Sequence, residues 1–179
     1  GGSGSGNAGS ANPALSADGN LVVFASDAGD LVAGDANGKT DIFLRNRTGR
    51  TTERISVNAS GASANGDSRN PVISADGRYV AFQSSDADLV GGDNNGRIDV
   101  FVRDRTLGQT VLVSVDNGGN NSGAGNSYSP QFTADGRKVA FASTADNLVT
   151  NDSNGTADAF VRDLTAGTTL LASVNTNGF

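Results

Sequence analysis

An internal repeat of about 58 residues constrains the fold of this chain more than any other feature of its sequence. Segments 13–57, 71–115 and 130–174 align with one another, and their starts lie 58 and 59 residues apart. Repeats of this length fold into copies of one supersecondary unit that bury their apolar faces against each other. We therefore expect residues 1–179 to form a single repeat domain of three units, numbered 1 to 3 along the chain.

The pattern inside each unit predicts four short strands. In unit 2, an apolar pair at Val72–Ile73 precedes a Ser-Ala-Asp-Gly turn, and a second strand follows at Tyr79–Ser84. A polar loop leads to an alternating third strand at 100–103, and a tight turn leads to a fourth strand at 110–115. The corresponding second strands of units 1 and 3 are Leu21–Ser26 and Lys138–Ser143. Because no segment shows a 3.6-residue period, we predict an all-β fold of three four-stranded antiparallel β-propeller blades.

The residues of each unit also resemble a known family. Pro-x-Leu/Ile/Phe-Ser/Thr-Ala-Asp-Gly-x-x-Val-x-Phe-x-Ser, followed by Asp-x-Phe-x-Arg, is similar to the WD40-like repeat of TolB-type β-propellers. The resemblance covers all three units. It implies a propeller fold and an extracytoplasmic setting, periplasmic or secreted, because the family includes periplasmic scaffolds, propeller domains attached to peptidases and secreted bacterial proteins. It implies no particular reaction.

Three blades are too few to close a propeller, because propeller rings contain about four to eight blades. An open set of three would expose an apolar sheet face at each end. We expect two chains to pair into a six-bladed ring with two-fold symmetry, so that the principal partner is a second copy. A nine-bladed ring of three chains, an open filament of stacked half-rings and a fragment of a longer propeller are the alternatives.

Composition excludes several functional classes. The chain has no Cys and no His, which removes disulfides, thiolate or imidazole metal sites and histidine-based catalysis. Its formal net charge of −6 argues against nucleic acid or an anionic membrane surface as partner. No apolar run is long enough to span a bilayer. The sequence starts Gly-Gly-Ser-Gly-Ser-Gly without an initiator Met, so an excised or engineered chain is an alternative to a natural secreted one.

One polar motif recurs in the loop between the second and third strands of every unit. Asp-x-Asn-Gly-x-x-Asp combines carboxylates, an amide and a glycine turn, as calcium-binding loops do. The Asp that opens such loops two residues earlier is replaced by Ala33, Gly91 and Thr150, so Asx-turn chemistry without metal is the competing interpretation. The candidate calcium ligands are Asp35, Asn37, Asp41, Asp93, Asn95, Asp99, Asp152, Asn154 and Asp158.

Two further sets of residues recur on the third strand and are expected to be structural. Arg45, Arg103 and Arg162 are predicted to pair with a neighbouring Asp or carbonyl group between blades. Phe43, Phe101 and Phe160 are predicted to fill the core between blades, together with the Phe of the second strand.

Antiparallel topology places all long loops on one side of the blades, and long loops on a rigid scaffold are where binding usually occurs. That side is rich in Asp, whereas Arg50, Arg78 and Arg137 fall in the tight turns of the other side. With a single Glu and three near-identical Asp environments, a catalytic pair with separated pKa values is not indicated. We therefore expect a non-enzymatic binding or scaffold module, with a glycan or protein as the ligand of the long-loop side. The alternatives are a structural assembly protein and the accessory propeller of a secreted hydrolase.

Overall fold

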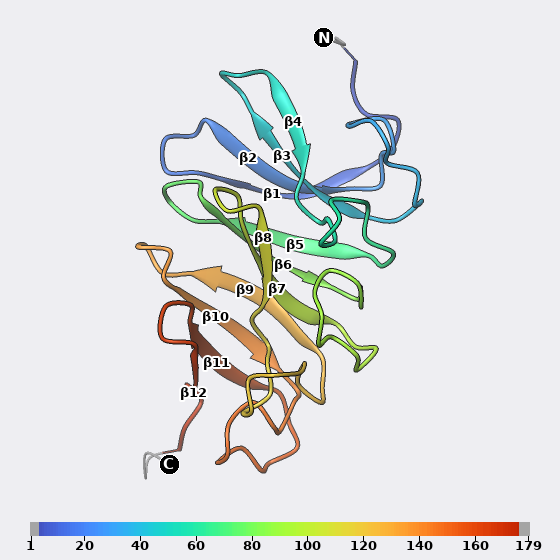
Figure 1. Ribbon diagram of the computed structural model, residues 1–179. Coiled ribbons are helices and arrows are strands. Elements are labelled where there is room, and N and C mark those ends of the chain that lie inside the picture. Colours follow the sequence, from blue (N-terminus) through green and yellow to red (C-terminus); the bar gives the residue numbers. More distant parts are fainter. Residues whose placement is uncertain (1–3, 176–179) are drawn as a thin grey trace.

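The computed structural model describes residues 4–175 and contains three four-stranded antiparallel sheets stacked one after another along the chain (Figure 1). Each sheet is formed by four consecutive strands in sequence order, which confirms the predicted all-β fold of propeller blades. Residues Gly1–Ser3 of the linker-like start lie outside the described residues. Within residues 4–175 there is no helix that could cross a membrane.

Blade 1 contains β1 (Ser10–Leu15), β2 (Leu21–Ser26), β3 (Asp41–Asn46) and β4 (Thr51–Arg54). Blade 2 contains β5 (Ser68–Ile73), β6 (Tyr79–Ser84), β7 (Asp99–Asp104) and β8 (Gln109–Leu112), and blade 3 contains β9 (Ser127–Phe132), β10 (Lys138–Ser143), β11 (Asp158–Asp163) and β12 (Thr168–Leu171).

The second strand of each blade has the predicted bounds, but the first strands are longer than predicted. β5 begins at Ser68, four residues before the apolar pair Val72–Ile73. Its pairing with β6 shifts register between Arg69 and Val72. Asn70 has a positive φ of 52°, and the following Pro71 has no N–H, so the strand passes through an irregularity that hides its first half from an alternation pattern. The fourth strands are shorter than predicted and end at Arg54, Leu112 and Leu171.

The Asp-Gly turns between the first and second strands form as predicted. In blade 1, Gly19 has a φ of 66°, which suits glycine. The Asp18 carboxylate accepts hydrogen bonds from the Ser16 hydroxyl (2.5 Å) and the Asn20 backbone N–H (2.9 Å). These bonds fix the turn locally, and Ser-Ala-Asp-Gly in blades 1 and 2 and Thr-Ala-Asp-Gly in blade 3 build the same corner.

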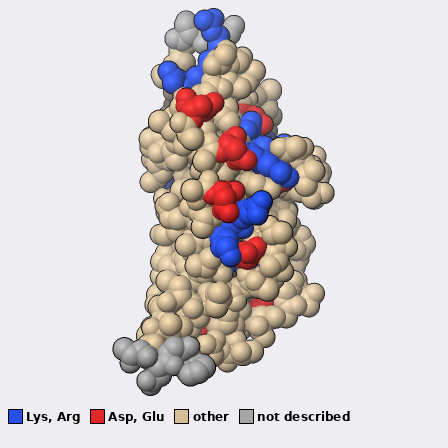
Figure 2. All heavy atoms as spheres, turned by 90° about the vertical axis from the view of Figure 1, so that its left-hand side faces the viewer, with Lys and Arg blue, Asp and Glu red and all other residues tan. Residues whose placement is uncertain are grey.

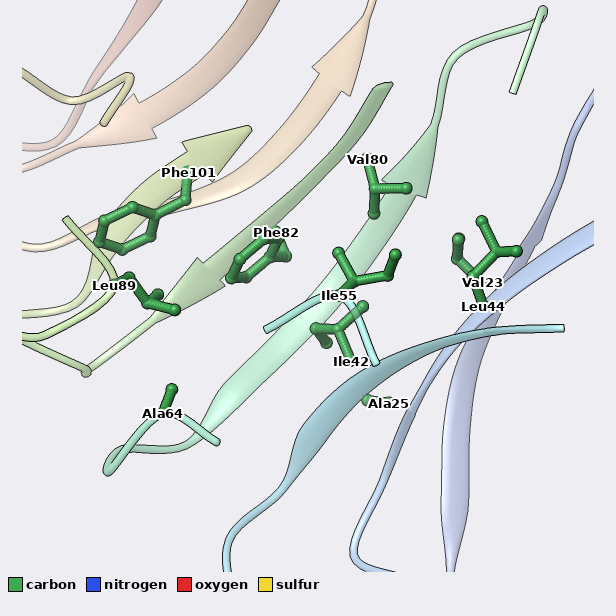
Figure 3. Packing of buried hydrophobic residues seen from close by; sticks show 10 residues of the cluster. All are labelled: Val23, Ala25, Ile42, Leu44, Ile55, Ala64, Val80, Phe82, Leu89 and Phe101. Carbon is green, nitrogen blue, oxygen red and sulfur yellow. The ribbon is translucent and has the colours of Figure 1, made fainter. Parts of the chain in front are cut away.

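The apolar core lies between blades, not within them. Figure 3 shows the cluster between blades 1 and 2, which includes Ile42 and Leu44 of β3, Phe82 of β6 and Phe101 of β7. A second cluster joins blades 2 and 3, with Val100 and Val102 of β7 facing the sheet of blade 3. Alternate residues of one strand therefore serve opposite junctions, as the two-residue period of a β-strand requires.

Each blade contains one pair of stacked Phe rings from its second and third strands. The centroids of Phe82 and Phe101 lie 5.9 Å apart, and the pairs in blades 1 and 3 have nearly the same spacing. Phe43, Phe101 and Phe160 are all fully buried. In blades 2 and 3 the pair packs against the preceding blade, whereas Phe24 of blade 1 is only half-buried, since residues 4–175 place no blade against it.

Candidate functional site: the long-loop side

The long loops gather on one side of the stack, at the right in Figure 1, and contact the connections between blades. The amide of Asn37 donates one hydrogen bond to the Asp41 carboxylate (2.9 Å) and one to the Ala64 carbonyl (2.8 Å). The Asn37 side-chain oxygen accepts the Lys39 backbone N–H. The motif thus ties its own loop to the chain segment that leads into the next blade. We call this arrangement the clasp.

The clasp of blade 2 repeats this geometry. The Asn95 amide donates to Asp99 (2.7 Å) and to the Gly123 carbonyl (2.7 Å). In blade 3, Asn154 donates to Asp158 (2.7 Å), and residues 4–175 supply no carbonyl partner equivalent to Ala64 or Gly123. The third clasp is therefore half-formed within the described residues.

The final Asp of each motif is held on both carboxylate oxygens. In blade 2, Ser114 donates its hydroxyl to Oδ1 of Asp99 (2.5 Å), while Oδ2 accepts from Asn95. Burial raises the pKa of Asp99 to about 6, although both hydrogen bonds oppose that shift. Burial raises the pKa of Asp41 in the same way. The Asn side-chain oxygens accept the backbone N–H two residues further on, as in Asx turns, whereas the carboxylates accept side-chain hydrogen bonds from Asn and Ser. Calcium binding by these residues stays a prediction.

The first Asp of the motif differs sharply between blades. Asp35 of blade 1 forms a buried ion pair with Arg54, with Nη1 3.2 Å from Oδ1. Asp93 of blade 2 is 7% exposed, and neither of its carboxylate oxygens accepts a well-formed hydrogen bond from residues 4–175, although the Ser122 hydroxyl and the Asn95 backbone N–H lie near enough to lower its pKa. Asp152 of blade 3 is 8% exposed and has one such unpartnered oxygen. No group of three or more acidic side chains positioned to hold a metal occurs within the same described range.

The recurrent arginines have a different partner from the one predicted. Instead of an Asp or a carbonyl group between blades, each Arg donates from Nη1 to a threonine hydroxyl on the fourth strand of its own blade. The distances are 3.0 Å for Arg45 to Thr52, 3.1 Å for Arg103 to Thr110 and 3.0 Å for Arg162 to Thr169. Arg103 and Arg162 also line hollows of about 300 and 260 Å³ at the two junctions. Burial lowers the pKa of both guanidinium groups.

The tight-turn side is mixed in charge and not uniformly basic. Figure 2 shows Lys and Arg alternating with Asp and Glu on that face. Arg78 pairs with Asp104 (2.7 Å), and Lys138 pairs with Asp163 (2.9 Å). The backbone N–H groups of the following turn and Lys138 lower the pKa of Asp163 to about 2. The basic residues in the tight turns are therefore partly neutralised by neighbouring carboxylates.

The sequence did not predict a concave wall along the first strands. β1, β5 and β9 lie side by side (Figure 1) and line a hollow of about 430 Å³. Its lining repeats the segment around each Pro13, Pro71 and Pro130, where the preceding residue has a positive φ. The three Pro residues at matching positions of the repeat could have located this wall from the sequence, because each lies on the first strand of its blade.

Comparison with known proteins supports the fold. No family model and no curated protein matches the chain. Among solved structures, TolB from Acinetobacter baumannii is similar over 93% of this chain and 32% of its own, with 17% identity and a TM-score of 0.54. The β-propeller domain of the Trilobed protease from Pyrococcus furiosus, described as having an open velcro topology, is similar over 93% of this chain and 43% of its own (13% identity, TM-score 0.55).

An oligogalacturonate lyase from Vibrio parahaemolyticus is also similar, over 88% of this chain and 37% of its own, with 14% identity and a TM-score of 0.53. The chain thus spans 32–43% of the length of these three matched chains. Identities this low concern the backbone arrangement and not the activity. The sheet topology and these similarities together show that the chain folds as three blades of a TolB-like β-propeller.

Proposed function

We propose that the chain is a non-enzymatic propeller scaffold module that pairs head to tail with a second copy to form a six-bladed ring. The observation that carries this proposal is the contrast between the covered faces of blade 2 and the two free faces at the ends of the stack. Blade 2 shows what each free face would contact, because it is packed on both sides by blades of the same kind.

The free face of blade 3 matches a face that is buried in blade 2. Ala81 and Val100 of blade 2 are fully buried against blade 3. Their counterparts in blade 3, Ala140 and Ala159, are exposed. Small apolar side chains in the middle of a sheet face leave room for the large side chains of a following blade.

The segment around Gly6 packs against blade 1 as a connection from a preceding blade would. A Cβ placed on Gly6 would lie 2.9 Å from side-chain carbons of Ala28 and Leu31. Gly123 approaches Ala145 and Leu148 of blade 3 in the same way. The segment around Gly6 therefore occupies on blade 1 the place that the blade 2–3 connection occupies on blade 3. In a head-to-tail pair, the Gly6 carbonyl of the second copy corresponds to Gly123 and would complete the clasp at Asn154.

The ring would also enclose the concave wall formed by β1, β5 and β9, because first strands border the central channel of a propeller. The long-loop side, with its clasps and buried carboxylates, is then the binding face for a glycan or protein. Following the TolB resemblance, we place this module outside the cytoplasm. A role as part of a larger enzyme is the second candidate, supported by the similarity to the propeller domain of the Trilobed protease.

The test is the absolute mass in solution, measured by light scattering over a wide concentration range. We expect a mass of about 36 kDa, twice the 18.0 kDa of one chain. Ala159→Arg places a charge on the free face of blade 3 and is expected to return the mass to that of one chain. Thr106→Arg, in the exposed turn between β7 and β8 of the middle blade, is the matched control and should leave the mass unchanged.

Three outcomes would contradict the ring. A wild-type mass of 18.0 kDa at all concentrations would favour a piece of a longer propeller. A mass that rises without limit would favour a filament, since head-to-tail contacts that fail to close produce open assemblies. Equal effects of Ala159→Arg and Thr106→Arg would show that the free sheet face is not the contact.

A further inference from the structure

We propose that blade 2 binds a calcium ion at the buried carboxylate of Asp93, in the place that the guanidinium of Arg54 fills in blade 1. This inference does not depend on ring formation. It rests on two blades with the same backbone, one of which contains a built-in cation and one of which does not.

The two positions are equivalent by strand register. Arg54 of β4 pairs with Phe43 of β3, and Leu112 of β8 pairs with Phe101 of β7. Asp35 and Asp93 both stand at the first position of the recurring motif. The fourth strand thus presents a cation toward the first Asp in blade 1 and an apolar side chain at the same place in blade 2.

In blade 1 the charges balance locally. The side chains of Arg54 and Asp35 are 8% and 4% exposed and lie 3.2 Å apart. A buried charge without a partner costs several kcal/mol, so the ion pair removes a penalty that either group alone would impose. The same penalty applies to Asp93, which is 7% exposed, and no described Lys or Arg forms an ion pair with it.

The surroundings of Asp93 contain oxygen atoms suited to a hard cation. The Ser122 hydroxyl is also buried, makes no well-formed hydrogen bond within residues 4–175 and lies near enough to Asp93 to lower the pKa of that carboxyl. Its backbone N–H donates to the Gly92 carbonyl (3.1 Å), which brings the two chain segments together. A Cβ on Gly92, where φ is +89°, would lie 2.7 Å from the Asn120 carbonyl oxygen, so only glycine allows this approach.

The local charge also favours a cation. Two further carboxylates, Asp86 and Asp88, lie on the same loop of blade 2. Burial raises the pKa of Asp93, the Ser122 hydroxyl and the Asn95 backbone N–H lower it, and the Asp86 charge adds a smaller raising effect. The counterparts of Asp86 and Asp88 are Ala28 and Asp30 in blade 1, and Ala145 and Asn147 in blade 3. Blade 2 therefore has three carboxylates on this loop, as many as blade 1, but it lacks the arginine that balances one of them in blade 1.

Calcium is the ion that fits this donor set. The candidate ligands are a carboxylate, a hydroxyl and backbone carbonyls, and the chain has neither Cys nor His to favour zinc or copper. Calcium accepts irregular oxygen coordination, whereas magnesium requires a near-octahedral arrangement and retains several waters. With few protein carboxylates in contact, we expect a Kd of about 10⁻⁴–10⁻³ M, the range of extracellular calcium modules.

The experiment is a set of thermal melts at pH 7.5 with EDTA, with 10 mM calcium chloride and with 10 mM magnesium chloride, together with calorimetric titration of calcium. Calcium should raise the wild-type Tm by about 3–10 °C and bind with one ion per chain. Asp93→Asn, which removes the buried charge, should have a higher Tm than the wild type in EDTA and no response to calcium.

Two further variants test the equivalence of the blades. Leu112→Arg gives blade 2 the cation of blade 1 and should also abolish the calcium response. Asp35→Asn is the matched control: it breaks the ion pair with Arg54 but should keep the full calcium-induced shift. If Leu112→Arg fails to fold, Asp93→Asn alone carries the test.

The proposal is overturned by any of three results. These are the absence of a calcium shift in the wild type, an equal shift in Asp93→Asn, or an equal response to magnesium. The first would show that Asp93 is simply protonated in the folded chain, and the second would place the ion elsewhere.

Discussion

Blades 2 and 3 share the same strand pairings, turns and Phe stack, yet their following faces have opposite environments. Val100 of β7 is fully buried, and its counterpart Ala159 of β11 is exposed. Phe101 and Phe160 pair with Leu112 and Leu171 in the same register. The sheet is thus specified within one repeat, whereas the core exists only where two repeats meet. Stability in such an array depends on junctions, as in other repeat proteins.

The strongest test of this comparison is Phe101→Ala in the middle blade. Phe101 is fully buried in the junction between blades 1 and 2, so its removal should lower the free energy of unfolding by about 3–5 kcal/mol. Phe24→Ala on the free face of blade 1 should cost clearly less, because that ring is only half-buried. Urea unfolding of both variants measures the difference. Equal losses would show that junction burial does not set the contribution of these rings.

Much of this architecture was predictable from local sequence. The second strands were predictable from their apolar residues, and the corners before them from the Asp-Gly turn signal. Both features occur in all three repeats. The first strands were underestimated because Asn70 and Pro71 interrupt their pairing, which no alternation pattern records. Burial of one sheet face and exposure of its copy could not be predicted locally, since that depends on which repeat follows.

The buried carboxylate of Asp93 shows the same limit at the candidate site. The motif predicted equal roles for the first Asp in all three repeats. The structure separates them through Arg54 and Leu112, which stand 19 residues further along the chain from Asp35 and Asp93. Comparing the repeats at the end of the fourth strand would have revealed the difference, although not that Asp93 is buried.

Val100→Ala sharpens the comparison between covered and free faces. Removing two carbons from this fully buried side chain should destabilise by about 2 kcal/mol through lost burial and a residual cavity. The reciprocal change, Ala159→Val, adds the same carbons to the free face of blade 3 and should leave the stability of a single chain almost unchanged. A gain in stability that depends on protein concentration would show that a second copy covers this face, as the proposed ring requires.

The clasp of the middle blade should produce an unusual pH dependence. Burial raises the folded-state pKa of Asp99 to about 6, above its value in the unfolded chain, so the folded state binds this proton more tightly. Its contribution therefore favours folding at low pH and is lost as pH rises through about 6, which amounts to about 1 kcal/mol between pH 5 and pH 7. Melts in EDTA at pH 5, 6 and 7 should show this trend, and Asp99→Asn should flatten it. Asp163→Asn is the control, because a pKa of about 2 lies outside this window.

The smallest expected change in stability concerns a partly exposed ion pair at the edge of the junction between blades 1 and 2. Arg105 of blade 2 contacts Glu53 of blade 1, with Nη2 2.6 Å from Oε1, whereas Leu164 and Val111 occupy the equivalent positions between blades 2 and 3. Both charged side chains are partly exposed, so a double-mutant cycle to Ala should give a coupling of only about 0.2–1 kcal/mol, reduced further in 1 M salt. A coupling of several kcal/mol that persists in high salt would mean that rim ion pairs, and not the apolar sheet faces, decide how firmly neighbouring blades adhere. The two junctions would then differ in strength despite their nearly identical cores.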